Sequence, residues 1–315
     1  FFLASHRDAY KFLHDQTVRL MNAGFTAPEI AEVLELPGVL AKQWFNRGYY
    51  GTMSHNSKAI YQRYLGWYDA NPANLNPLPP EPGPGTIPAT RWRPGSRAAR
   101  APGPRSSSSC SSGSGRTGSR SALADMAGDL RLSATFLNHV VFSGFFFFFN
   151  DTATTEIYTH LAFESEAGTW RNIYLTGAQE LRDGVMEIPM TGPNADVLSA
   201  TTTPMLLDVA AVRVNPERAN QRSFKINIEL ADRDERHLVT VGNGVLIHET
   251  GIRDDLAGAT IRMKRVDLLM TLFVGVPVAS LVVSGSISIE GDATLYDAFV
   301  GLMEPLTPNF PIVTP

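Results

Sequence analysis

The sequence predicts a multidomain chain in which an all-α region is followed by an α+β domain with one antiparallel sheet covered by helices. Apolar residues recur at helical spacing through residues 7–69, whereas in Phe224–Leu230 they alternate with polar residues, as in a half-buried strand. At 315 residues, with 43% hydrophobic and 18% charged, the chain is long enough for two domains that each bury a core.

Composition argues against several classes of partner. A net charge of -4 gives no reason to expect nucleic acid or an anionic membrane surface. The longest apolar stretch, LLMTLFVGVPVASLVV, is interrupted by Gly275 and Pro277 and is too short to span a bilayer. The first residues, FFLASHRDAYKF, lack the features of a signal peptide, so the start looks internal. We therefore expect no nucleic-acid partner and no membrane span.

Four helices are expected in residues 1 to about 80. The first, Arg7–Ala23, carries apolar residues on one face and ends at Gly24, which suits a left-handed cap. The second begins with a capping box formed by Thr26 and Glu29 and stops before Pro37. The third and fourth are expected over residues 39–47 and 57–69.

One polar constellation, NRGYYGTMSHNSK, separates the third and fourth expected helices. Arg47 could hold an oxyanion bidentately, Tyr49 or Tyr50 could donate a phenolic hydrogen bond, and His55 could donate or titrate near neutral pH. Composition alone favours the alternative, an aromatic-rich turn in which Asn56 caps the next helix.

The carboxy-terminal domain reads as alternating helices and strands. We expect helices over 203–214, 266–273 and 293–303, and strands in FKINIEL, ATIRMKR and SLVVSGSISIEGD, with a hairpin of HLVTV and VLIHE turning at GNG. The helix around DLLMTLFVG is apolar nearly all round. Such a helix must face either the hydrophobic core or an apolar ligand cavity, and the core is the commoner case. The residues concerned are Leu268, Leu269, Leu272 and Phe273.

Two segments do not look like native protein. Residues 81–122 consist almost wholly of Arg, Pro, Gly, Ser and Ala, as expected of a GC-rich gene read out of frame; the alternative is a basic linker, and both predict disorder. The sole cysteine, Cys110, lies there. Residues 145–159, FFFFFNDTATTEIYT, look like translated sequencing adapter, the alternative being a buried strand. Resequencing the source locus across codons 81–160 tests both interpretations.

The strings HDQTVRLMNAGFTAPEIAEVLELP and WFNRGYYGTMSHNSKAIYQRYLGWYDANPANLNPLPP closely resemble the helical dimerisation region of bacterial alkyl sulfatases, in the metallo-β-lactamase superfamily. The resemblance covers residues 7–80 and resumes in 123–192, where residues 145–159 replace a family helical hairpin. It implies a homodimer and a pocket for the sulfate group. A tyrosine near Tyr50, or His55, would help hold the sulfate, within the set Arg47, Tyr49, Tyr50, His55 and Asn56.

The last domain resembles the carboxy-terminal domain of alkyl sulfatases, through MLLDVAAVRV, SGSISIEGD and PLTPNFPIVTP, and has a sterol-carrier-protein-like pattern. The resemblance implies that Leu268, Leu269, Leu272 and Phe273 bind an alkyl chain. The family's zinc centre needs clustered ligands such as H-x-H-x-D-H. Here no two histidines are closer than eight residues, so we expect no metal site and no catalytic residue in this chain. Zinc would belong to the intact parent.

The sequence thus predicts four segments: a helical dimerisation region (1–80), a disordered frameshifted stretch (81–122), an interrupted helical remainder (123–192) and a sterol-carrier-protein-like domain (193–315). The interpretation is a carboxy-terminal fragment of a zinc-dependent alkyl sulfatase that supplies dimerisation and alkyl-chain binding. The intact parent, which could be periplasmic or secreted, would hydrolyse long-chain alkyl sulfates to alcohol and sulfate. The alternatives are a stand-alone carrier of lipids or detergents and a purely structural dimerisation piece.

Overall fold

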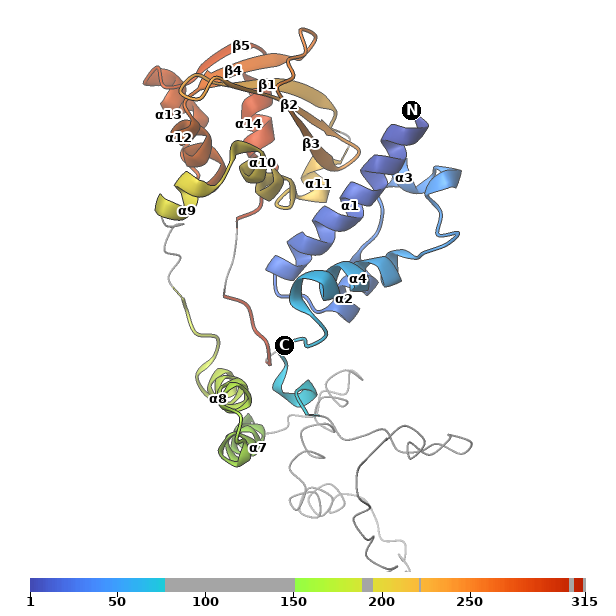
Figure 1. Cartoon of the computed structure of the whole chain (residues 1–315), viewed down its shortest axis with the longest axis vertical. Helices are drawn as coiled ribbons and strands as arrows, with labels where there is room; N and C mark the ends of the chain where they lie inside the picture. The colour runs from blue at the N-terminus through green and yellow to red at the C-terminus, as the bar shows by residue number, and fades with distance from the viewer. Residues whose placement is uncertain (77–150, 189–194, 221, 306–308, 314–315) are drawn as a thin grey trace, which may run out of the picture. The chain divides into compact units, whose positions relative to one another are not determined.

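The computed structural model describes residues 1–76, 151–188, 195–220, 222–305 and 309–313 (Figure 1). These residues form two compact units, one from residues 1–69 with 185–311 and the other from residues 70–184 with 312–315. The expected disorder of 81–122 and the first part of the expected helical remainder, residues 123–150, lie outside the described residues. Among those described, no helix is long and apolar enough to cross a membrane.

The amino-terminal part is helical, as predicted. Its elements are α1 (Phe2–Asn22), α2 (Ala27–Val33), α3 (Gly38–Ala41), the short 3-10 helix η1 (Trp44–Asn46) and α4 (Met53–Leu65). The capping box of Thr26 and Glu29 is present. Two expectations were wrong. The third helix is split into α3 and η1, and α4 begins before Ser57 because the Thr52 hydroxyl accepts from the His55 amide at 3.1 Å. Asn56 therefore lies inside α4 and does not cap it.

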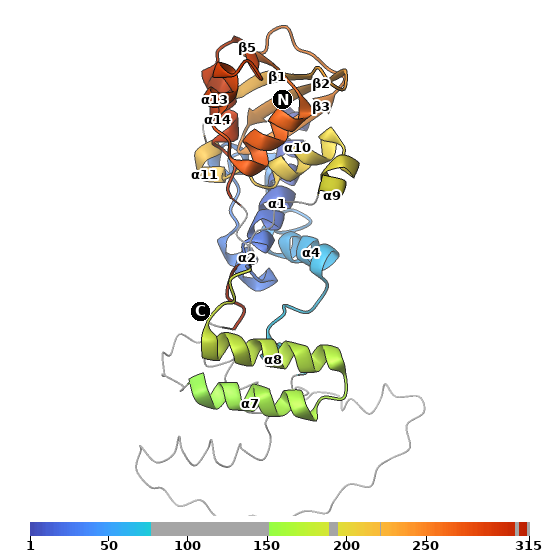
Figure 2. The ribbon, with the colours of Figure 1, turned by 90° about the vertical axis from the view of Figure 1, so that its left-hand side faces the viewer.

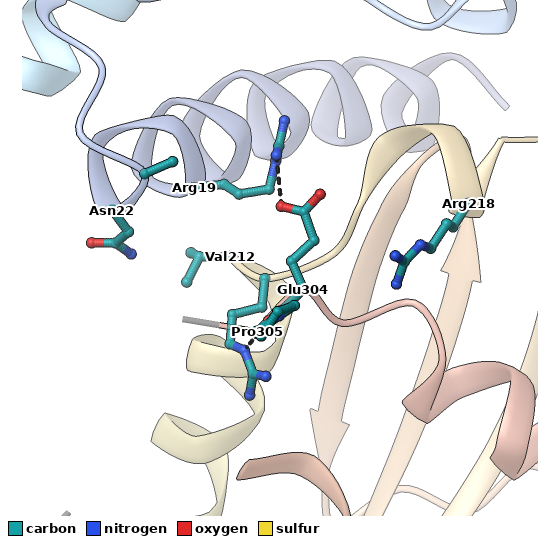
Figure 3. Close-up of a pocket in the computed structure, with 8 residues that line it drawn as sticks. Arg19, Asn22, Val212, Arg218, Glu304 and Pro305 are labelled. Atoms are coloured by element: carbon teal, nitrogen blue, oxygen red, sulfur yellow. Dashed lines mark hydrogen bonds and ion pairs between the residues drawn. The ribbon is translucent and has the colours of Figure 1, made fainter. Parts of the chain in front are cut away.

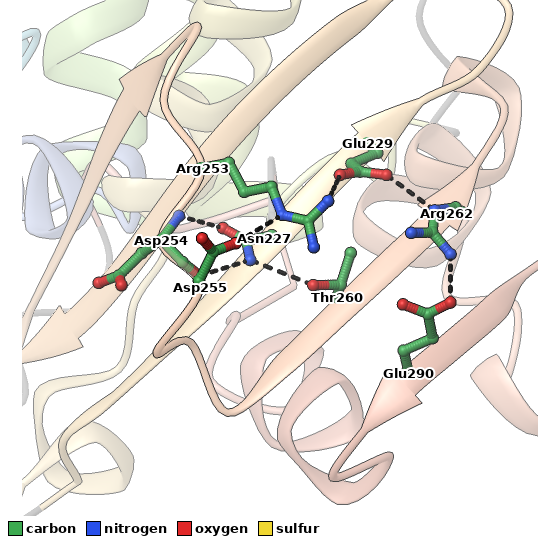
Figure 4. Close-up of polar contacts among 8 residues, drawn as sticks. All are labelled: Asn227, Glu229, Arg253, Asp254, Asp255, Thr260, Arg262 and Glu290. Carbon is green, nitrogen blue, oxygen red and sulfur yellow. Dashed lines mark hydrogen bonds and ion pairs between the residues drawn. The ribbon is translucent and has the colours of Figure 1, made fainter.

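The carboxy-terminal part contains one five-stranded sheet in the order β3-β2-β1-β4-β5. The strands are β1 (Phe224–Leu230), β2 (Glu235–Gly242), β3 (Val245–Thr250), β4 (Ala259–Met263) and β5 (Ser288–Gly291). The alternating strand and the hairpin are confirmed, but the purely antiparallel sheet is not, because β1 and β4 pair in parallel. After β3 the chain crosses to the other side of β1 and forms β4 there. The side-chain amide of Asn227, on β1, fixes this crossover, since its nitrogen donates to the Asp254 carbonyl at 2.9 Å and its oxygen accepts from the Asp254 backbone amide at 3.0 Å (Figure 4).

Helices cover one face of the sheet (Figure 2). They include α10 (Thr203–Ala211), α12 (Arg265–Leu269) and α14 (Thr294–Val300), which bury Leu207, Leu268 and Phe299 against strand residues such as Ile226 and Ile261. Shorter elements join them: α9 (Ala195–Ala200), α11 (Pro216–Ala219), the π-helix η4 (Met270–Val274) and α13 (Val278–Val283). The single strand expected in SLVVSGSISIEGD was wrong. Pro277 precedes a helical turn, α13, and only Ser288–Gly291 pairs with β4.

The opposite face of the sheet is divided between a charged part and an apolar part. Glu229 of β1 pairs with Arg262 of β4 at 2.8 Å, and Arg262 also pairs with Glu290 of β5 (Figure 4). Arg253, in the connection between β3 and β4, pairs with Glu229 at 3.3 Å. On β3, Val245 belongs to the same buried cluster as Phe12 of α1.

Polar contacts also join α1 to the carboxy-terminal part. The amide of Asn243 donates to Asp8 at 2.9 Å, and the amide of Gln16 donates to the Val214 carbonyl at 2.9 Å. These bonds and the shared cluster explain why residues 1–69 belong to the same unit as the sheet.

The second unit contains η2 (Pro72–Asn74) and a helical hairpin of α7 (Asp151–Glu164) and α8 (Gly168–Asp183). The hairpin buries Tyr158 against Tyr174, with ring centroids 6.1 Å apart. The Glu180 carboxylate accepts from the backbone amides of Ile312 and Val313 at 2.9 and 2.8 Å. Residues 151–159 of the adapter-like segment form the first part of α7, and their origin in adapter DNA stays a prediction to be tested by resequencing.

Candidate functional site

The polar constellation of the sequence lines a pocket of about 300 Å³ in the first unit. Three segments and the single residue Leu36 build it; the segments are the first half of α1, the stretch from η1 through residues 47–52, and the first turn of α4. Its lining residues are His6, Ala9, Tyr10, Leu13, Leu36, Phe45, Asn46, Arg47, Gly48, Tyr49, Tyr50, Gly51, Thr52, Met53 and Asn56. The pocket therefore combines an apolar wall with a polar loop.

Helix α1 contributes two aromatic rings from one face. His6 and Tyr10 lie four residues apart, and their ring centroids are 5.0 Å apart in an edge-on arrangement. The Asn46 amide nitrogen donates to the Leu40 carbonyl at 3.0 Å, so its oxygen is left to accept. His6 Nδ1 lies 3.1 Å from that oxygen and is assigned as the donor. Neutral His6 would then present Nε2 as an acceptor.

Two glycines allow the loop between η1 and α4 to fold tightly. A Cβ on Gly48 would lie 2.6 Å from the Gly51 carbonyl oxygen, and a Cβ on Gly51 would lie 2.8 Å from the Asn56 side-chain oxygen. The Tyr49 amide also donates back to the Arg47 carbonyl at 2.8 Å. Asn56 is thereby packed against the loop from α4, and both tyrosines are held on the outside.

Four of the five residues predicted to bind sulfate line this pocket: Arg47, Tyr49, Tyr50 and Asn56. The side chains of Tyr49 and Tyr50 are 70% and 107% exposed, and Arg47 is exposed as well. Within the described residues, the Arg47 guanidinium has no ion-pair partner. His55 does not line the pocket; its Nδ1 lies 3.1 Å from the Thr52 hydroxyl at the start of α4.

Sequence reasoning missed the apolar wall of the pocket. Phe45 and Asn46 were expected inside a third helix over residues 39–47, and no sequence pattern indicated that His6 or Tyr10 would line a pocket. The spacing of four residues between His6 and Tyr10 could have placed both on one face of a helix. Nothing in the local sequence indicates that Asn46, 40 residues away, contacts His6. An apolar cleft with a guanidinium and phenols at its rim suits an amphiphile with an anionic, oxygen-rich head group.

The four residues predicted to bind an alkyl chain lie on α12 and η4. Leu268 and Leu272 are 0% and 3% exposed and are packed in the core under the sheet. Leu269 and Phe273 are half-buried, and the Arg213 guanidinium lies 5.3 Å from the centre of the Phe273 ring. Leu268 and Leu272 thus pack as core residues do, and the alkyl-chain role of the four stays a prediction.

The part of the chain that the structure describes holds no cluster of side chains suited to metal ligation. No group of three or more histidine, cysteine, aspartate or glutamate side chains is clustered there.

Comparison with known proteins identifies the class of both parts. The family model for alkyl sulfatase dimerisation matches residues 26–85 and 105–184, and the model for the alkyl sulfatase C-terminal domain matches residues 192–315. The stereoselective inverting sec-alkylsulfatase Pisa1 from Pseudomonas sp. has a similar structure, with 31% identity and a TM-score of 0.54 over 99% of this chain and 46% of that chain. The two parts are therefore a dimerisation region and a C-terminal domain of the alkyl sulfatase type.

Two curated relatives match along nearly the whole chain. The alkyl/aryl-sulfatase BDS1 of Saccharomyces cerevisiae is 36% identical over 99% of this chain. The (R)-specific secondary-alkylsulfatase of Pseudomonas sp. is 32% identical over 100% of it. The chain spans 45% and 44% of the length of these relatives. It belongs to the alkyl sulfatase family and corresponds to the carboxy-terminal part of its members.

Proposed function

We propose that the pocket lined by Arg47, Tyr49, Tyr50 and Asn56 receives the sulfate end of a long-chain alkyl sulfate. The observation that carries this proposal is the exposed Arg47 guanidinium, without an ion-pair partner in the described residues, at the mouth of a cleft with apolar walls. A guanidinium forms charge-assisted, bidentate bonds to sulfate oxygens, and the phenols of Tyr49 and Tyr50 add donors. The wall of Leu13, Phe45 and Met53 would accept the first carbons of the chain.

In the complete enzyme this pocket would form one side of the active site. We propose that the parent is a zinc-dependent hydrolase that cleaves primary or secondary alkyl sulfates to alcohol and sulfate. The zinc would be held outside the described part of this chain, whose own residues bind and orient the substrate. Alone, the chain would bind alkyl sulfates without hydrolysing them.

Titration of the full chain with octyl sulfate, below its micelle concentration, tests the binding step by calorimetry. We expect saturable binding that is weaker for octanol, which lacks the anionic head group. Arg47→Gln should weaken octyl sulfate binding roughly tenfold or more, since a hydrogen bond to a charged group contributes about 1.5–3 kcal/mol. Octanol binding should be nearly unchanged.

The matched control is Arg63→Gln, which removes another exposed arginine, on α4 and outside the pocket. It should leave both affinities unchanged. Equal losses in the two variants would indicate non-specific charge attraction and reject the pocket. Saturable binding that is insensitive to Arg47 and equally strong for octanol would instead favour a general carrier of apolar molecules.

We also propose that the chain forms a homodimer. The match to the alkyl sulfatase dimerisation family supports this, as do the large exposed aromatic side chains of the helical region, among them Trp44 and Trp67 at 70% and 77% exposure. Light scattering coupled to gel filtration should give twice the 34.4 kDa chain mass. A monomer that persists as concentration rises from micromolar to hundreds of micromolar would reject the dimer.

A further inference from the structure

A relay of hydrogen-bonded side chains joins the middle of α1 to the last turn of α4, which packs against it (Figure 1). Asp15 Oδ1 lies 2.9 Å from His14 Nδ1, and His14 Nε2 lies 2.8 Å from the Tyr64 hydroxyl. Lys11, one turn earlier on α1, forms an ion pair with the other Asp15 oxygen at 2.8 Å. None of these residues lines the pocket around Arg47, so the relay is a separate cluster.

The chemistry of its two ends assigns the protons along the relay. The Asp15 carboxylate can only accept, so the hydrogen of neutral His14 is assigned to Nδ1, which donates to it. His14 Nε2 then carries a lone pair and accepts from the Tyr64 hydroxyl. The imidazole ring is thus held through both nitrogens, and its basic nitrogen is directed at the phenolic proton.

Exposure to solvent increases along the relay. The side chain of Asp15 is 5% exposed and that of His14 is 43% exposed, while Tyr64 is 57% exposed. The relay therefore runs from a buried carboxylate, through a partly covered imidazole, to a phenol that solutes can reach. This is the order of groups in an acid–histidine–nucleophile site, with a phenol in the place of a serine hydroxyl.

We propose that Tyr64 is a reactive phenol that is acylated by activated esters, with His14 as its general base and Asp15 as the residue that positions the base. The Tyr64 oxygen attacks the ester carbonyl carbon while its proton passes to His14 Nε2. A bond forms between that oxygen and the acyl carbon, and the bond from the acyl carbon to the leaving oxygen breaks. The leaving group then takes the proton from His14, so the products are an acylated Tyr64 and a free alcohol or phenol.

The test treats the full chain with p-nitrophenyl acetate and locates the acetyl groups by peptide mass spectrometry over time. Tyr64 should be acetylated faster than Tyr50, which is 107% exposed and whose hydroxyl has no hydrogen-bond partner within the described residues. His14→Gln should slow acetylation of Tyr64 about 100-fold, at the low end of the range for a positioned general base. Tyr64→Phe should remove this acetyl group and leave the labelling of Tyr50 unchanged.

The pH profile distinguishes a general base from a merely structural contact. Imidazole changes charge between about pH 5 and 8, so the wild-type rate at Tyr64 should rise and level off within this range. In His14→Gln the rate should instead rise about tenfold per pH unit, with the phenolate fraction. The matched control is His160→Gln, at an exposed histidine of α7, which should change neither the rate nor its profile. Equal rates at Tyr64 and Tyr50, or a Tyr64 rate unaffected by His14→Gln, would overturn the proposal.

Discussion

The contact between α1 and the β2–β3 hairpin should make the helical region and the sheet unfold together, and Phe12→Ala tests this. Phe12 is 2% exposed and shares a buried cluster with Val245 of β3. Truncating a buried phenylalanine to alanine costs about 3–5 kcal/mol, because it loses burial and leaves a cavity. With a urea slope of about 2 kcal/mol per molar, the midpoint should fall by roughly 1.5–2.5 M.

Hydrogen exchange read by mass spectrometry shows where that free energy is lost. Peptides from α1 and from β2–β3 should both exchange about 100-fold faster or more in Phe12→Ala, since 3 kcal/mol corresponds to roughly that factor. Val33→Ala, at a residue 53% exposed, is the control and should change stability by about 0.5 kcal/mol or less. If β3 kept its wild-type exchange while α1 loosened, the two parts would be separate domains and the reasoning would be refuted.

Three further substitutions probe single features of the first unit. Thr52→Val removes the hydroxyl that caps α4 and should lower the free energy of unfolding by about 1 kcal/mol in urea, with no change expected if the cap is unimportant. Asn227→Ala, at a residue 2% exposed, removes both bonds to Asp254 and should cost about 1–3 kcal/mol; an unchanged melting temperature would refute its role in the crossover. Burial lowers the pKa of His237, which is 0% exposed, so the stabilising contribution of neutral His237 is complete above the unfolded value of about 6.5 and is lost as pH falls through the lower folded value. Unfolding titrations from pH 7.5 to 5 should show this decline, and His237→Gln should flatten it; an equal slope in both proteins would contradict the assignment.

Local sequence signals predicted the elements whose conformation is set locally. The period-two alternation of β1 places Ile226, Ile228 and Leu230 on the buried face. The turn between β2 and β3 requires positive φ angles, and Asn243 and Gly244 supply them at 54° and 79°. The capping box of α2 was predicted for the same reason, since its partners lie three residues apart.

Elements that depend on distant contacts could not be predicted in this way. The direction of β4 follows from a crossover held by Asn227, whose polar side chain reads simply as an outward strand position. The apolar run at Val278–Val283 fits a strand as well as a helix. It forms the helix α13, which begins directly after Pro277 and follows η4. The candidate pocket shows the same distinction. Its segment Arg47–Asn56 is contiguous and could be predicted, whereas His6 lines the pocket only because of the tertiary fold and could not.

Helix α1 connects two cavities of the first unit. His6 and Tyr10, in its first half, line the pocket around Arg47, and Arg19 and Asn22, near its end, line a second cavity together with Glu304 (Figure 3). At a rise of 1.5 Å per residue, His6 and Arg19 are about 20 Å apart along one continuous helix. A continuous helix packed along one face moves as a rigid element, so the ion pair of Arg19 with Glu304 also helps to set the position of His6. The position of the proposed substrate wall is therefore set by the carboxy-terminal domain as much as by the helical region that contains it.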